Sequence, residues 1–95
     1  SVGIDMAGSV DLKKFNQWVS WLLQNKGTDI FRSKGIVSVA GHNERFVFQG
    51  VHMLFDAQAD RNWQPGEERR NQLVFIGRNL DRDELTKGFK ACLVK

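Results

Sequence analysis

The sequence predicts an α+β fold, a mainly antiparallel sheet of about four strands with two helices on one of its faces. Three observations lead to this prediction. Two segments repeat apolar residues at helical spacing, and several short runs are rich in β-branched and aromatic residues. Their order along the chain is strand, helix, strand, strand, strand, helix. The ferredoxin-like arrangement, or a variant of it, is the nearest common architecture.

Length and composition indicate one domain with a core of its own. The chain has 95 residues, 41% of them hydrophobic, with seven Phe and three Trp. The net charge of +3 comes from interspersed basic and acidic residues, so charge alone argues little for nucleic acid. No apolar run approaches the ~20 residues of a membrane span. The single cysteine suits a reducing compartment, and we expect a cytoplasmic protein, although a targeting segment upstream of Ser1 is not excluded.

The first third of the chain predicts a short strand over 2–7 and then a helix. Apolar residues recur at helical spacing from Leu12, which predicts a helix over 12–25. Either Ser9 or Asp11 can cap its start. We expect Gly27 to end it in a left-handed conformation.

The middle of the chain predicts a hairpin followed by a long loop. Residues 36–40 and 45–55 read as its two strands, and Gly50 in the second indicates a bulge or a close backbone approach. Residues 56–71 are polar and are expected to form the longest loop. Residues 73–76 are continuously apolar and predict a strand buried on both faces.

The last helix has the clearest start signal in the chain. Asp81 can cap it, and Glu84 three residues later is placed to complete a capping box. Leu80 and Leu85 flank the cap as a hydrophobic staple. The apolar positions that follow, among them Cys92, lie on one face of this helix.

The residues of a catalytic or metal site are not gathered anywhere in the sequence. There is no Gly-x-x-x-x-Gly-Lys-Ser/Thr segment that would cradle a nucleotide phosphate. The candidate metal ligands His42, His52 and Cys92 have none of the close spacings of a zinc site, which needs four ligands when it is structural. Cys92 is predicted to be a small core residue. We therefore expect no catalytic residue, metal or cofactor within this chain.

Two tryptophans are candidates for contact with a partner. Trp21 projects opposite the apolar stripe of its helix, where it is either an interface anchor or packed beneath the N-terminal segment. Trp63 lies among Arg61, Arg69 and Arg70. It either contributes to a docking surface or folds back as a lid on the edge of the sheet.

A nucleic-acid-binding module on an RRM-like scaffold is the alternative function. Such a module stacks bases on exposed aromatic residues of a strand with a characteristic glycine spacing. Phe46 and Phe48 occupy a comparable strand, but the glycine spacing is absent. We expect both side chains to face the helices.

Two long motifs and their neighbours resemble the C-terminal domain of the CobW-type GTPase metallochaperones. The resemblance covers about residues 30 to 93, and the first 30 residues match only in pattern. It rests on residues 31–36, 46–53, 63, 70–81 and 89–93.

The resemblance implies a role for this chain and a context for it. The family joins an N-terminal GTPase domain, which carries the nucleotide and metal motifs, to a C-terminal domain like this one. GTP with Mg and zinc or cobalt are thus implied for a full-length protein, and residues 1–95 are expected to be one domain of it. The implied role is recognition of a client metalloprotein, or transmission of the nucleotide state from the GTPase domain. As docking residues we predict Trp21, Arg32, Lys34, Gln49, His52, Trp63 and Arg70.

Overall fold

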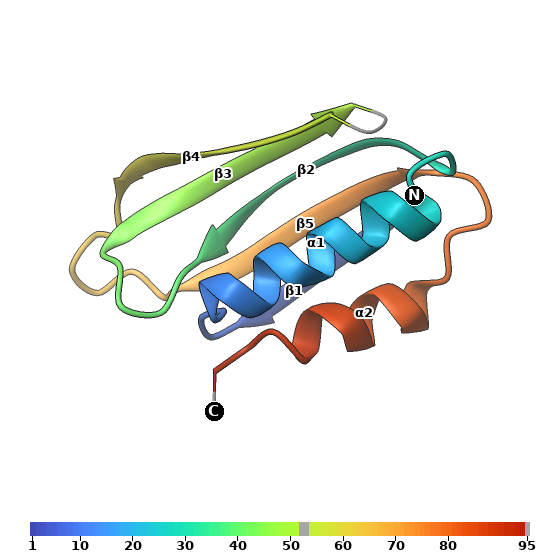
Figure 1. Ribbon diagram of the computed structural model, residues 1–95. Coiled ribbons are helices and arrows are strands. Elements are labelled where there is room, and N and C mark those ends of the chain that lie inside the picture. Colours follow the sequence, from blue (N-terminus) through green and yellow to red (C-terminus); the bar gives the residue numbers. More distant parts are fainter. Residues whose placement is uncertain (52–53, 95) are drawn as a thin grey trace.

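The computed structural model describes residues 1–51 and 54–94 and forms two layers, a sheet and a pair of helices (Figure 1). His52 and Met53 lie outside the described residues, as does Lys95. The elements in chain order are β1 (Val2–Ala7), α1 (Leu12–Lys26), β2 (Ile30–Ser38), β3 (Glu44–Val51), β4 (Leu54–Asn62), β5 (Arg70–Gly77) and α2 (Arg82–Lys90). Neither helix combines the length and hydropathy needed to cross a membrane.

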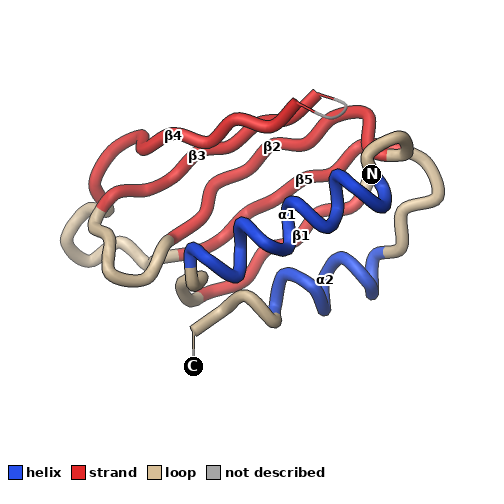
Figure 2. Tube along the Cα trace, viewed as in Figure 1, coloured by secondary structure: helices blue, strands red, loops and turns tan. Residues whose placement is uncertain are grey.

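The sheet has five strands in the order β1-β5-β2-β3-β4, and every neighbouring pair is antiparallel. β1 and β2 therefore run parallel to each other, with β5 between them and α1 connecting them. This split β-α-β unit is the one that ferredoxin-like folds use. Both helices cover the same face of the sheet, and the other face has no helix (Figure 2). The predicted fold class is confirmed, with one strand more than expected.

The additional strand is β4, and the prediction of a loop over 56–71 is wrong for its first half. Residues Leu54–Asn62 pair with β3, from Val51 opposite Leu54 to Glu44 opposite Asn62. β4 is an edge strand whose side chains are mostly exposed, so it needs no run of large apolar residues. Its signal is the alternation of Asp56, Gln58 and Asp60 with two alanines, a period of two in polar and small side chains.

β2 begins six residues earlier than the predicted strand 36–40. Its central position explains this length, because β3 pairs with one of its edges and β5 with the other. Gly50 of β3 makes the predicted close approach. A Cβ there would lie 2.7 Å from Ser33 Oγ and 3.1 Å from the Leu54 carbonyl oxygen.

Of the two candidates for the N-cap of α1, the structure uses Asp11 and not Ser9; the predicted N-cap Asp81 of α2 is confirmed, and the predicted C-cap of α1 is wrong. Asp11 Oδ1 accepts from the Lys14 amide at 3.1 Å, and Asp81 Oδ1 accepts from the Glu84 amide at 3.1 Å. The expected left-handed Gly27 instead has φ −58° and ψ −33°. The chain stays right-handed there because a turn follows at once, in which the Asp29 amide donates to the Lys26 carbonyl.

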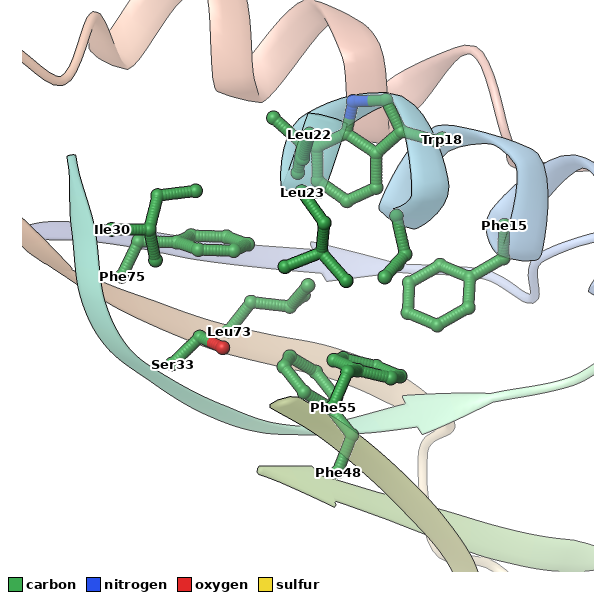
Figure 3. Close-up of a pocket in the computed structure, with 11 residues that line it drawn as sticks. Phe15, Trp18, Leu22, Leu23, Ile30, Ser33, Phe48, Phe55, Leu73 and Phe75 are labelled. Carbon is green, nitrogen blue, oxygen red and sulfur yellow. The ribbon is translucent and has the colours of Figure 1, made fainter. Parts of the chain in front are cut away.

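The core lies between the helices and one face of the sheet. Phe15 and Leu22 of α1 and Phe89 of α2 are buried against Leu73 and Phe75 of β5. Figure 3 shows the apolar space that remains beneath α1, with Trp18, Phe48 and Phe55 among its walls. Its volume of about 20 Å³ is that of a single water molecule, so it is a packing defect and not a ligand site.

Candidate functional site

The face of the sheet that carries no helix gathers four of the predicted docking residues. We call it the open face. Because side chains alternate along a strand, Ser33 and Phe48 point into the core while their neighbours Lys34 and Gln49 point away from it. Arg32, Lys34, Gln49 and Arg70 all take the outward position in their strands, although they come from β2, β3 and β5.

The strand register aligns these residues in rows across the open face. One row runs through Val74, Lys34, Gln49 and Asp56 on four adjacent strands. The next row runs through Ile76, Arg32, Val51 and Leu54. Charged, amide and apolar side chains therefore alternate across the sheet, and no two of the like-charged residues named here face each other directly.

Apolar side chains on the open face were missed by the sequence analysis, and its prediction that the strand at 73–76 is buried on both faces is wrong, because Ile76 faces outward. Four of them are well exposed, namely Val47 at 38%, Ile76 at 42%, Val51 at 52% and Leu54 at 77%. A shallow hollow of about 390 Å³ occupies the middle of this face. It is lined by Lys34, Gly35, Ile36, Val47, Phe48, Gln49, Gln72 and Val74. The missed signal was the two-residue period of β3, in which Val47 and Val51 alternate with core residues.

The charges of the open face divide into paired and unpaired groups. Arg70 contacts Glu68 at 2.5 Å and Asp5 at 2.9 Å, and these hydrogen bonds raise the pKa of its guanidinium. Arg32 and Lys34 make no ion pair with any residue that the structure describes. Positive charge on the open face is thus available to a partner mainly along β2.

Trp63 lies at one end of the open face. Its amide donates to the Asn43 carbonyl at 2.9 Å, and its side chain shares a hollow with Ile36, Arg70 and Gln72. The indole Nε1 is buried, and no acceptor for it is found among the described residues. This indole therefore extends the candidate surface beyond the ends of β2 and β5.

One other predicted docking residue is not part of this site. Trp21 is 44% exposed, but it belongs to α1, which covers the opposite side of the sheet. His52 lies outside the described residues. Phe46 and Phe48 face the core as predicted, so neither offers the exposed strand aromatic that base stacking requires.

The comparisons with known proteins agree with this architecture. Residues 1–93 match the family described as the cobalamin synthesis protein cobW C-terminal domain. This chain belongs to the CobW C-terminal domain family. The matched residues begin at Ser1, whereas the motifs on which the resemblance rests begin at Phe31.

Among curated proteins, this CobW C-terminal domain is similar to the zinc chaperone YjiA of Escherichia coli. The two are 31% identical over 90 residues, which cover 94% of this chain and 28% of YjiA. The solved structure of Zn(II)-bound YjiA GTPase from E. coli superposes with a TM-score of 0.92 at 28% identity. It covers 98% of this chain and 29% of that one, and a Zn(II)-bound triple mutant of YjiA gives the same values. The chain thus spans less than a third of the length of these relatives.

Side chains that could bind a metal do not cluster in the described part of this CobW C-terminal domain. Within residues 1–51 and 54–94, no three His, Cys, Asp or Glu side chains come close enough to share an ion. Cys92 is 3% exposed, and burial is the main cause that raises the pKa of its thiol. Its Sγ lies 3.4 Å from the Gly88 carbonyl oxygen and 3.6 Å from that of Lys14, which confirms its predicted role as a core residue.

Proposed function

We propose that this chain is the non-catalytic docking domain of a GTP-dependent metallochaperone that delivers zinc or cobalt to a client metalloprotein. In this proposal residues 1–95 are one domain of a longer cytoplasmic chain. The GTPase domain of that chain binds GTP with Mg and the metal. The domain described here recognises the client or transmits the nucleotide state to it. Family membership supports the proposal, as does the similarity to YjiA, a zinc chaperone and GTPase.

The observation that carries the proposal is the composition of the open face. Exposed Val47 lies two positions along β3 from the residue that pairs with Lys34. Exposed Ile76 lies directly opposite Arg32. Protein interfaces combine an apolar centre with arginine and polar groups at the rim in this way. Exposed apolar side chains gathered on one face with polar and charged groups among them are typical of an interaction surface.

The role of the open face is tested by measuring the binding of this chain to the GTPase portion of YjiA. We expect this chain to bind the separately expressed N-terminal portion of YjiA. The double substitution Val47→Glu and Ile76→Glu should weaken that binding at least about tenfold, because it buries charge in the contact. Trp21→Ala serves as the control on the helix side and should leave the affinity within about twofold.

A second measurement tests the division of labour between the two domains. Titration of this chain alone with zinc and with GTP should show no tight binding of either. Sub-micromolar affinity of the isolated chain for zinc or GTP would refute the proposal. So would a loss of YjiA binding in Trp21→Ala together with full binding in the open-face variant, because the docking surface would then be on the helix side.

A further inference from the structure

A second charged surface lies where α1 begins and α2 ends, on the helix side of the sheet. A wide, open hollow of about 760 Å³ lies there. Its lining combines three lysines with three apolar residues. The lining residues are Lys14, Lys87, Lys90, Ala91, Leu93 and Val94, and we call this surface the lysine hollow.

Helix electrostatics explain only part of this lysine cluster. Lys87 and Lys90 occupy the last turn of α2, where the helix dipole favours positive charge. Lys13 and Lys14 occupy the first turn of α1, which contains no acidic residue. A cation there opposes the dipole, so Lys14 is in an electrostatically unfavourable place as far as folding is concerned.

The cluster has no ion pair among the described residues. Within the part of the chain that the structure describes, Lys14, Lys87 and Lys90 take part in none of the ion pairs. Asp11 is the nearest acidic residue in sequence to Lys14, and its Oδ1 is engaged in capping α1 through the Lys14 amide. The three ammonium groups are therefore open to an external anion.

The walls of the lysine hollow are held in place by backbone hydrogen bonds between distant parts of the chain. The Asp11 amide donates to the Cys92 carbonyl at 2.8 Å, and the Val94 amide donates to the Ser9 carbonyl at 2.9 Å. These bonds join the segment after α2 to the start of α1. The lysines are thus carried on a preorganised frame, which lowers the entropic cost of binding.

We infer that the lysine hollow binds an acidic peptide segment of a partner protein. Glutamate or aspartate side chains pair with Lys14, Lys87 and Lys90, and one apolar side chain packs on Leu93 and Val94, the latter 46% exposed. The apolar residues of the lining favour a peptide over inorganic phosphate, because a peptide can bury an apolar side chain against them. The lining contains no aromatic residue on which a nucleic-acid base would stack. Because this surface lies on the helix side, it can be occupied while the open face holds another partner.

The probe is a short synthetic peptide in which glutamates flank a central leucine, with a glutamine version as its matched control. Binding is followed by two-dimensional NMR of this chain. We expect shifts at the lysine hollow with the glutamate peptide, and a loss of affinity of about tenfold when NaCl rises from about 0.05 to about 0.2 M. The glutamine peptide should bind at least about tenfold more weakly.

Two charge reversals separate this binding from a structural role of the lysines. Lys14→Glu should raise the melting temperature, because it places an acid at the helix N-terminus, and should weaken peptide binding about tenfold. Arg78→Glu makes the same change in net charge on the turn after β5. It also breaks the ion pair between Arg78 and Asp29, so the NMR spectrum of the variant is checked first for a native fold. Its peptide affinity should then stay within about twofold.

Several results would overturn the inference. Equal binding of the two peptides, or no detectable binding of either, would do so. An equal loss of affinity in Arg78→Glu would show that only net charge matters. Binding to anionic phospholipid vesicles without any binding of the glutamate peptide would assign the hollow to a lipid surface instead. Because none of these results involves the open face, they leave the proposed function untouched.

Discussion

The side chain of Asn71 in β5 hydrogen bonds to the backbone of Ser38 at the end of β2, with 2.8 Å between Asn71 Oδ1 and the Ser38 nitrogen. Both residues are fully buried. Asn71 Nδ2 also donates to the carbonyls of Met6 and Gly8 at 3.2 and 3.0 Å. One amide group therefore joins the ends of β1, β2 and β5 at the place where the strands give way to loops.

Replacing Asn71 with alanine should be strongly destabilising. The substitution leaves the buried Ser38 amide without a partner, and it removes a donor from the part-buried carbonyls of Met6 and Gly8. A buried group left unpaired costs about 1–3 kcal/mol. We expect the free energy of unfolding to fall by about 2–4 kcal/mol in a urea titration. Gln72→Ala, at the exposed neighbouring position, should change it by less than about 0.5 kcal/mol. Similar losses in the two variants would contradict this role of Asn71.

Gly88→Ala tests the contact between α2 and Trp18. Alanine normally stabilises a helix relative to glycine by about 1 kcal/mol. A Cβ at Gly88 would, however, lie 2.3 Å from Trp18 Nε1, and that ring packs against Phe75 and Phe89 and cannot simply move aside. We expect overpacking to outweigh the gain, with a net loss of about 1–2 kcal/mol in chemical unfolding.

The double variant with Trp18→Leu separates these two effects of Gly88→Ala. With the indole removed, the same alanine should become stabilising, because only its helix propensity remains. Gly3→Ala is the matched control in β1, where a Cβ would have no neighbour closer than 3.9 Å. If Gly88→Ala destabilises as much without the Trp18 ring as with it, the clash is not the cause.

Glu67 links the loop before β5 to β4 and should make stability depend on pH in acid. Its carboxylate accepts from Arg61 at 2.8 and 2.9 Å and from the Gln64 amide, and these bonds lower its pKa from 4.5 to about 2. Because the folded pKa is the lower one, the stabilisation is complete above pH 4.5. It is lost as the pH falls toward 2.

Carbon-detected NMR of the Glu67 carboxyl group gives a direct measurement, with an expected midpoint near pH 2. Glu67→Gln should flatten the fall in melting temperature below pH 4.5. Glu44→Gln is the control, since Glu44 is exposed and in no ion pair with the other described residues. A Glu67 midpoint at the ordinary value would rule out the strong pairing with Arg61.

Cys92 should be almost inert toward thiol reagents in the folded chain. It is 3% exposed, and burial raises the pKa of its thiol, so both access and the thiolate population are reduced. We expect the reaction with a disulfide reagent at pH 8 to be at least about a hundredfold slower than in guanidinium, where the thiol has ordinary reactivity. Rapid labelling of the native chain would show that the segment after α2 separates readily from the start of α1.

The sequence by itself determined the helices, the first strand and the fold class. Periodicity of 3.6 residues and the acidic caps at Asp11 and Asp81 are local signals, since they depend only on residues within a turn of each other. The motifs that resemble the CobW C-terminal domain are also local, and they indicate the family from the sequence alone.

Only the tertiary structure decided the extent of β2 and β4, the conformation of Gly27 and the two separate surfaces. Strand pairing depends on partners far along the chain, so a polar segment such as Leu54–Asn62 becomes a strand once β3 supplies the hydrogen bonds. The same long-range pairing aligns Lys34 with Val74 and Gln49, and helix docking sends Trp21 to the opposite side. The two-residue period within a strand indicates which face a side chain takes, but the register between strands decides which residues of different strands lie side by side.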